Sequence, residues 1–203
     1  MRFTFAYINH DQKVHANFLQ PCLNVLKGEF DVIARDSNQS PASNYNYIIS
    51  NSQNRYVIFS HQDMSFSPDL LEKVEQTINA YPDFGVLGHV GRDKTGNYCW
   101  NNNEKSYLVE TLDSCLIVID RENNITFDEK TFDDCHLYVE DYCMQVQTQK
   151  SKECRTLLIG RNFHFGSYLM HHSNTLQQQG SNWGRYNLYK DRMKTKWGTV
   201  YTT

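Results

Sequence analysis

The sequence predicts a single α/β domain in which a mixed, mostly parallel sheet is flanked by helices. The first third of the chain alternates β-rich runs with helical stretches in the order β-α-β-α-β, which is typical of parallel strands with right-handed crossovers. The 203 residues are enough for one full-sized domain. With 39% hydrophobic and 21% charged residues, the composition excludes a disordered, collagen-like or coiled-coil chain.

The strands of the first third are expected at three β-rich runs, Arg2–Ile8, Phe30–Ala34 and Arg55–Ser60. In open parallel sheets, ligands bind at the carboxyl ends of the strands. The sequence therefore predicts that Asn9, Asp36 and the segment 61–63 lie together, although dozens of residues separate them along the chain.

Helices are expected between and after these strands. The first is indicated by apolar residues at helical spacing, Val14, Phe18, Cys22 and Val25. Gly28 is its expected stop. A polar loop over Asp36–Ser43 precedes the second helix, predicted at Asn44–Gln53. The third is predicted to begin at the Ser-Pro-Asp sequence 67–69 and to end near Ala80, because Ser is a good cap and Pro suits the first turn.

The remainder of the chain predicts further strands, a long helix and a helical tail. Strands are expected at Phe84–Val90, Ser106–Glu110, Cys115–Asp120 and Arg155–Ile159, with a turn at Asp93–Asn97. A buried helical stripe is indicated by Phe132, Cys135, Val139, Tyr142 and Val146, which step by three and four residues. The polar and aromatic tail is expected to form one helix packed over the site.

Composition also limits the partners and the compartment. A formal net charge of −3 gives no dominant basic surface, which argues against a nucleic-acid binder. No apolar run approaches the ~18 residues of a membrane helix, and the N-terminus lacks the pattern of a signal peptide. The six cysteines are scattered without a CxxC pair, so we expect buried thiols in a reducing cytoplasm and neither a zinc knuckle nor a disulfide framework.

The polar segment His61-Gln62-Asp63 ends a buried-type strand and precedes the third helix. This order places its side chains at the carboxyl edge of the sheet. Asp63 offers a hard oxygen ligand, which Mg²⁺ or Mn²⁺ prefers when the ion also holds a diphosphate. The alternative is that Asp63 only hydrogen-bonds the following loop.

Two further segments could carry chemistry. Glu140 and Asp141 flank the buried stripe of the long helix, and one of them could deprotonate an acceptor hydroxyl. Spacing alone favours a solvated acidic surface there over this catalytic role. The neighbouring His171 and His172 point in different directions on regular backbone, so at most one of them is expected to serve a given metal.

These residues together resemble family-2-like glycosyltransferases of the GT-A fold, in particular a small subgroup named after a streptomycin-biosynthesis protein. The resemblance extends over residues 3–173. Its most specific part is Tyr45-Asn46 followed by residues 56–63, which end in a Phe-x-His-Gln-Asp motif where GT-A enzymes carry Asp-x-Asp. The segment Thr111–Ser114 is similar to the acceptor-side segment, and Tyr138–Cys143 to the later acidic motif that contributes the general base.

The resemblance implies roles for individual residues. The nucleotide is expected to contact Tyr7, Asn9, Asp36, Asn46, His61 and Gln62. Asp63 would bind Mn²⁺ or Mg²⁺, and His172 (or His171) would complete the metal's ligands. Asp141 is the expected general base, with Glu140 and Asp113 as rivals. Residues 1–100 would then form the nucleotide-binding half of one domain over 1–203, and residues 101–203 the acceptor-side half with the C-terminal tail.

The implied activity is metal-assisted transfer of a sugar from a nucleotide-diphosphate donor, most simply a UDP-sugar, to a hydroxyl of a saccharide or small-molecule acceptor. Two alternatives remain open at this point. The domain could bind a nucleotide or a partner without catalysis, since His61 stands where the first acid of Asp-x-Asp is expected. It could also be a metal-dependent hydrolase that uses His61, Asp63 and a later histidine.

Overall fold

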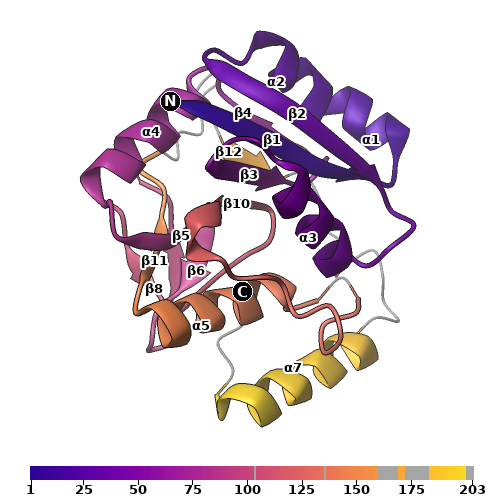
Figure 1. The fold of residues 1–203 in the computed structure, drawn as a ribbon, viewed down its shortest axis with the longest axis vertical. Coiled ribbons are helices and arrows are strands. Elements are labelled where there is room, and N and C mark those ends of the chain that lie inside the picture. Colours follow the sequence, from indigo (N-terminus) through magenta and orange to yellow (C-terminus); the bar gives the residue numbers. More distant parts are fainter. Residues whose placement is uncertain (103, 135, 160–168, 172–182, 200–203) are drawn as a thin grey trace.

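The computed structural model describes residues 1–102, 104–134, 136–159, 169–171 and 183–199. These residues form a central sheet with helices on both faces (Figure 1). In spatial order its strands are β2 (Glu29–Asp36), β1 (Arg2–Asn9), β3 (Tyr56–Ser60), β10 (Leu116–Asp120), β5 (Phe84–Gly88), β11 (Glu153–Thr156) and β8 (Leu108–Val109). Strand β1 is parallel to β2 and β3, and β11 is parallel to β5, whereas β10 runs antiparallel between β3 and β5. The predicted mixed, mostly parallel α/β sheet is confirmed.

Smaller elements complete the described fold. One small sheet pairs β12 (Leu169–His171) with β4 (Met64–Phe66), and another has the order β7 (Tyr98–Trp100), β6 (Val90–Arg92), β9 (Thr111–Leu112). The helices are α1 (Gln12–Asn17), α2 (Leu19–Val25), α3 (Pro41–Asn51), α4 (Leu70–Ala80), α5 (Tyr138–Lys150) and α7 (Trp183–Trp197), with a 3₁₀ turn η1 at Arg121–Asn123.

The central strand β3 is buried on both of its faces. Val57 and Phe59 pack in one hydrophobic core with residues of α3 and α5. Tyr56 and Ile58 point to the opposite side and pack in a second core with residues of α2 and α4. This alternation follows from the two-residue period of a strand, and it explains why the sequence of β3 is apolar almost throughout. Each such buried side chain contributes about 1.5–3 kcal/mol to the free energy of unfolding.

The first helical stretch differs from the prediction. The sequence indicates one helix through Phe18, but the structure has two, with Phe18 between them at φ −120° and ψ −66°. Pro21 explains the break, because its ring would clash with the carbonyl group of Asn17 in a continuous helix. The apolar spacing is helical on both sides of the break, so the pattern alone does not reveal it.

Two helices begin at other residues than expected. Helix α3 begins at Pro41, inside the predicted loop, because Ser40 caps it by accepting a hydrogen bond from the Ser43 amide at 3.2 Å. Helix α4 begins at Leu70, since the Ser67 hydroxyl donates to the Asp69 carboxylate and does not cap the helix. Its predicted end at Ala80 is confirmed.

The second half departs from the predicted boundaries more widely. Helix α5 begins at Tyr138, after Leu137 in the left-handed region at φ 60°. Phe132 is fully buried but precedes the helix, so the predicted stripe is helical only from Val139 onward. The strand expected over 106–110 shortens to β8, and the one expected over 155–159 is β11, two residues earlier. The turn at 93–97 is confirmed by the bond from the Asp93 amide to the Asn97 carbonyl oxygen, 3.0 Å.

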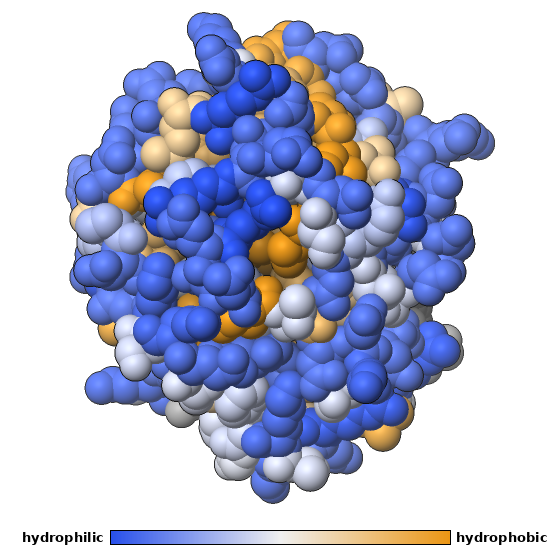
Figure 2. Space-filling model, viewed as in Figure 1, coloured by the Kyte–Doolittle hydropathy of each residue, from blue (hydrophilic) through white to orange (hydrophobic). Residues whose placement is uncertain are grey.

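The surface agrees with the globular composition. Figure 2 shows the face that carries α3, α5 and α7 as largely hydrophilic, with hydrophobic residues visible in separate patches. No described helix is long and apolar enough to cross a membrane. The described cysteines are free; Cys115, Cys143 and Cys154 are buried as expected, whereas Cys22 and Cys99 are partly exposed.

Gly85 is required for the close approach of α5 to the sheet. A Cβ atom at this position would lie 1.9 Å from Cγ1 of Val146. We expect Gly85→Ala to lower the free energy of unfolding by about 1–3 kcal/mol, as overpacked cores do. Gly184→Ala is the matched control, because a Cβ there meets no atom within 4 Å and alanine favours a helix. Urea denaturation of both variants checks this; equal stability of the two would contradict the packing argument.

Candidate functional site

The carboxyl ends of three parallel strands meet at one edge of the sheet. Asn9 at the end of β1 lies opposite Asp36 at the end of β2. On its other side, Tyr7 of β1 lies opposite Ser60, the last residue of β3. The segment 61–63 therefore follows at the same edge. This confirms the predicted juxtaposition of Asn9, Asp36 and the His-Gln-Asp segment.

Gln62 joins two of the loops at this edge. Its side chain is completely buried, and Oε1 accepts hydrogen bonds from the amides of His10 at 2.9 Å and Asp11 at 3.2 Å. Asp11 in turn caps α1, accepting from the amides of Lys13 and Val14. Gln62 thus holds the connection from β1 to α1 in place through backbone groups. Its Nε2 is buried and has no hydrogen-bond partner among the described residues.

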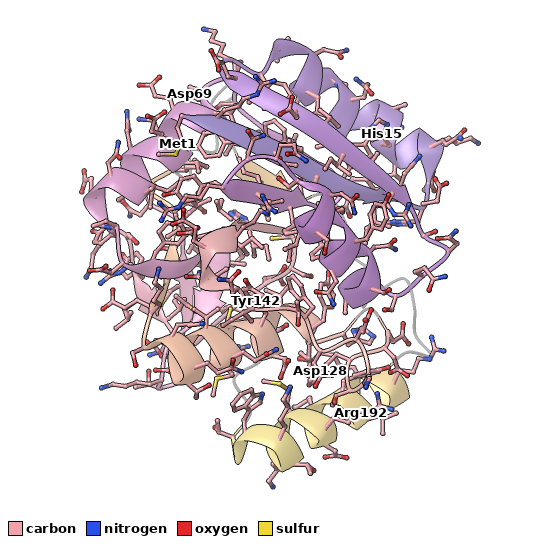
Figure 3. All side chains as sticks on the ribbon, in the orientation of Figure 1. Met1, His15, Asp69, Asp128, Tyr142 and Arg192 are labelled. Carbon is pink, nitrogen blue, oxygen red and sulfur yellow. The ribbon has the colours of Figure 1, made fainter. Side chains whose placement is uncertain are left out.

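An aromatic pair closes the other side of the same connection. The rings of Tyr7 and His15 are stacked, with centroids 4.8 Å apart and planes at 19° (His15 is labelled in Figure 3). Burial raises the pKa of Tyr7 and lowers that of His15, so the imidazole is neutral at neutral pH. Asn9 Oδ1 and His15 Nε2 are buried and, within the part of the chain that the structure describes, make no hydrogen bond. With Gln62 Nε2, three polar atoms around this connection are left for a ligand.

The loop after β3 is fixed by its neighbours. The His61 amide donates to the carbonyl oxygen of Cys115 at 2.9 Å, and the Ser60 hydroxyl donates to the His61 carbonyl oxygen at 2.9 Å. His61 Nδ1 lies 3.9 Å from Asp63 Oδ1, and the Asp63 side chain is 14% exposed. The two side chains of the motif therefore share one small region at the edge of the sheet.

Asp113 is positioned next to this loop by a tight turn. Its amide donates to the Val90 carbonyl oxygen at 2.9 Å, and its Oδ1 accepts from the Cys115 amide at 2.7 Å. Burial raises the pKa of the Cys115 thiol, and the charges of Asp113 and Asp63 raise it further. Both carboxylates thus lie within electrostatic reach of the same thiol. The structure brings the metal candidate and one of the base candidates together.

The expected solvated surface at Glu140 and Asp141 is wrong, because both side chains are buried. Asp141 Oδ1 accepts a hydrogen bond from Trp197 Nε1 at 2.7 Å and forms an ion pair with Lys196 Nζ at 2.8 Å. Its Oδ2 accepts from Gln145 Nε2 at 2.9 Å. Burial raises the pKa of Asp141 in spite of these donors. The side chain expected to be the general base is instead enclosed where α7 meets α5.

Glu140 has a different environment from its neighbour. It is 5% exposed in the first turn of α5, and its charge acts on Tyr138 and Cys143. Tyr138 is hydrogen-bonded to Tyr45 and to Ser114, the residue after Asp113. Glu140 therefore acts on Tyr138 and Cys143, whereas Asp141 is held by residues of α7.

Asn46, one of the residues expected to contact the nucleotide, is hydrogen-bonded to the backbone of a distant segment. Its Nδ2 donates to the Phe127 carbonyl oxygen at 2.9 Å, and its Oδ1 accepts from the Phe127 amide at 2.8 Å. Both ends of the amide are used by one residue 81 positions away. This pairing satisfies the side chain in the structure, and the ribose or diphosphate contact expected of Asn46 stays a prediction.

The described residues offer few ligands for a metal. No group of three or more His, Cys, Asp or Glu side chains among them is arranged to hold an ion. Strand β12 brings the backbone of His171 opposite Met64, the residue after Asp63, but the His171 side chain and the whole of His172 lie outside the described residues. Asp63 alone, with the phosphate oxygens of a nucleotide, is still compatible with Mg²⁺, which usually keeps few protein ligands.

Helix α7 docks on acidic residues through its cationic side. Lys196 bonds Asp128 at 2.7 Å as well as Asp141, and Arg192 bonds Asp133 at 2.7 Å. Figure 3 labels Arg192 on α7 and Asp128 on the side of that helix toward α5. The expected C-terminal helix is present, and it covers Asp141. The sequence predicts this helix but carries no signal for Asp141 and Asp128 as partners of Lys196, because they are 55 and 68 positions away from it.

Comparisons with known proteins agree with this fold. A family model described as "Glycosyl transferase family 2" matches residues 11–144. No curated protein matches the chain. S. aureus TarS 1-349 is similar in structure, with a TM-score of 0.54 and 14% identity over 77% of this chain and 58% of that one. The structure of TarS 1-349 in complex with UDP has a TM-score of 0.56 and 12% identity, over 96% of this chain and 66% of that one.

A mannosyltransferase from Pyrobaculum calidifontis, in complex with GDP-Man and Mn²⁺, is also similar. The TM-score is 0.55 at 10% identity, over 80% of this chain and 58% of that one. At such identities these likenesses show the fold alone. The chain spans less than two thirds of the length of the TarS 1-349 structure and of the mannosyltransferase.

The docking of α7 predicts a dependence of stability on pH. Burial opposes ionisation of Asp128, but hydrogen bonds from Lys196 and Thr131 outweigh it and hold the pKa well below its usual range. A carboxyl whose pKa is lower in the folded protein stabilises the fold above its ordinary pKa, about 4, and loses this effect as the pH falls further. Asp128→Asn should lower Tm by about 2–4 °C at pH 7 and flatten the loss of stability below pH 4.

Thermal unfolding between pH 3 and 7 provides the measurement. Asp83→Asn is the control, because Asp83 is exposed on the turn before β5. Acid dependence that is identical in the wild type and in Asp128→Asn would show that the Lys196 contact contributes nothing to docking.

Proposed function

Because the chain belongs to glycosyl transferase family 2, we propose that it transfers a sugar from a nucleotide-diphosphate donor to a hydroxyl of an acceptor. The observation that carries this proposal is the set of three buried polar atoms without described partners, Asn9 Oδ1, His15 Nε2 and Gln62 Nε2, at the ends of parallel strands. Buried polar atoms are almost always hydrogen-bonded, so a polar ligand is the natural partner for them. The free thiols among the described residues fit the cytoplasmic setting expected from the sequence.

The nucleoside is assigned to the connection from β1 to α1. Tyr7 and Asn9 line it, and Asp36 lies at the neighbouring strand end. Gln62 and His15 offer a donor and a polar ring atom there, one of them held by backbone contacts and the other by stacking. A UDP-sugar is the expected donor, in keeping with the UDP complex of the S. aureus protein.

The diphosphate is assigned to the loop after β3. His61 and Asp63 lie in this region, and Asp63 would hold Mn²⁺ or Mg²⁺ together with the phosphate oxygens. The Mn²⁺ in the complex of the Pyrobaculum calidifontis mannosyltransferase supports this choice of metal. When bound, the ion would neutralise negative charge on the leaving diphosphate. One carboxylate beside a diphosphate would otherwise repel it, so the two groups are compatible only with a cation between them.

We assign the general base to Glu140 in place of Asp141. An acceptor hydroxyl must lose its proton as it attacks the anomeric carbon, and a base must reach that hydroxyl. Asp141 has Lys196, Trp197 and Gln145 on its oxygens, which leaves it no access to an acceptor. Glu140 is 5% exposed, and its charge acts on Tyr138, which is hydrogen-bonded to Ser114 beside the Asp113 turn. Asp113 is the remaining rival.

The two adjacent carboxylates give a direct test of this assignment. Glu140→Gln should reduce release of UDP from UDP-glucose or UDP-N-acetylglucosamine by about 10²–10⁴-fold, the usual effect of losing a general base, with UDP affinity unchanged. Asp141→Asn should lower Tm and keep the pH dependence of turnover. Nucleotide release and thermal unfolding are measured on both variants. If Glu140→Gln keeps full activity, and Asp141→Asn loses activity while its stability is unchanged, Asp141 is the general base and the assignment to Glu140 is wrong.

The metal assignment is tested by titrating UDP calorimetrically against Mn²⁺ concentration. Wild-type affinity should rise with Mn²⁺ and fall in EDTA, because the ion links Asp63 to the diphosphate. Asp63→Ala should retain the fold and lose the metal-dependent part of the affinity. If the UDP affinity of the wild type does not change with Mn²⁺ concentration and Asp63→Ala binds UDP equally well, the metal assignment is wrong and His61 or a basic side chain holds the phosphates. Binding of UDP and GDP without turnover of any donor would favour a binding domain over an enzyme.

A further inference from the structure

The hairpin of β6 and β7 exposes two aromatic rings on one face. Tyr98 is 52% exposed and Trp100 is 36% exposed. They are two residues apart in a strand, so both side chains project to the same side. Their ring centroids lie 6.1 Å apart with planes at 29°. Large aromatic side chains are usually buried in a soluble protein, and a pair aligned at the surface indicates a binding surface.

Both rings are held in position by neighbouring side chains. The buried His89 contacts the Trp100 ring edge-on, with centroids 5.7 Å apart and planes at 73°. The Arg92 guanidinium lies 3.7 Å from the centroid of the Tyr98 ring, and its Nη1 donates to the Gly96 carbonyl oxygen. Arg92 covers one face of the Tyr98 ring and leaves the rest of it exposed. Rings that are already ordered lose little conformational freedom when a ligand binds.

The pair of rings, Tyr98 and Trp100, lies next to the proposed catalytic edge. Trp100 is opposite Val90 in the ladder, and the Val90 carbonyl oxygen accepts from the Asp113 amide. Neighbouring strands are about 4.8 Å apart, so the backbone of Trp100 lies about 10 Å from that of Asp113. Residues opposite one another in a ladder project to the same face. The aromatic pair therefore extends outward from the Asp113 turn, with Trp100 nearer to it and Tyr98 farther away.

We propose that Tyr98 and Trp100 form an acceptor subsite that binds a neutral saccharide, with successive sugar rings stacked on Trp100 and Tyr98. This inference rests on the proposed glycosyltransferase function. The face of an aromatic ring is negative, and the C–H groups on the flat side of a sugar ring are positively polarised, while the hydroxyls at the sugar's rim remain in water. Charges near the rings are few and of both signs, Arg92 and Lys94 against Asp93, which leaves one net positive charge and no basic cluster that would favour a polyanion over a neutral ligand.

The size of the aromatic pair argues against a protein partner. Two fully buried aromatic side chains supply at most about 500 Å², and a stable protein interface needs about 800 Å² on each side. Two rings in line suit a narrow, linear ligand. The continuity with Asp113 then places one end of that ligand where its hydroxyl can meet the donor sugar.

The test uses the full-length protein with three linear neutral tetrasaccharides, chitotetraose, cellotetraose and maltotetraose, as probes. Binding is followed by ligand-observed NMR. Trp100→Ala and Tyr98→Ala should each weaken binding of the preferred probe by about tenfold or more. UDP affinity and donor hydrolysis should remain at the wild-type level, and thermal unfolding confirms that each variant is folded. Tyr47→Ala is the matched control, because Tyr47 is 46% exposed on α3 and has Arg35 4.0 Å from its ring centroid.

Each outcome decides for or against the subsite. No binding of any probe by the wild type, or equal binding by Trp100→Ala, overturns it. Self-association of the wild type that is lost in Trp100→Ala, measured by sedimentation, would assign the rings to a second copy of the chain and also overturn it. Probe binding that depends on both rings, in a protein that neither binds UDP nor releases it from a donor, would support the saccharide subsite while rejecting the proposed transfer activity.

Discussion

Burial of β3 on both faces is the constraint on which the rest of the structure depends. Val57 and Phe59 fill one core and Tyr56 and Ile58 the other, so neither helical layer can form without this strand. A strand buried on both sides must also pair along both edges, because its backbone groups have no access to water. Strand β1 pairs with one edge in parallel, and β10 with the other edge antiparallel. The polar segment 61–63 follows directly at the end of β3.

Hydrogen bonds to backbone groups then fix the loop that follows β3 and the connection from β1 to α1. The His61 amide is held by the Cys115 carbonyl oxygen, and Gln62 Oε1 holds the amides at the start of α1. These contacts join three segments that are far apart in the sequence. Because the loops are fixed before any ligand binds, the ordering cost at binding is small. The polar atoms left over at this edge are then available to a nucleotide, while the backbone around them is already satisfied.

Adjacent residues on a helix can contact different parts of the structure, as Glu140 and Asp141 show. One residue turns an α-helix by about 100°, so neighbouring side chains contact different elements. Asp141 faces α7 and is neutralised by Lys196, with Trp197 as a further donor. Glu140 acts instead on Tyr138, which is hydrogen-bonded to Ser114 beside Asp113. The docking of α7 anchors the first turns of α5 through Asp141.

The sequence by itself determined the α/β class, the parallel order of the first three strands and the meeting of Asn9, Asp36 and Asp63 at one edge, because strand period and crossover handedness are local or topological rules. It also indicated the C-terminal helix. Only the tertiary structure decided that Asn46 is hydrogen-bonded to the backbone of Phe127 and that Asp141 forms an ion pair with Lys196. Those partners come from segments 81 and 55 positions away. Spacing along a chain carries no information about which distant segment a side chain will meet, and packing of the assembled elements supplies it.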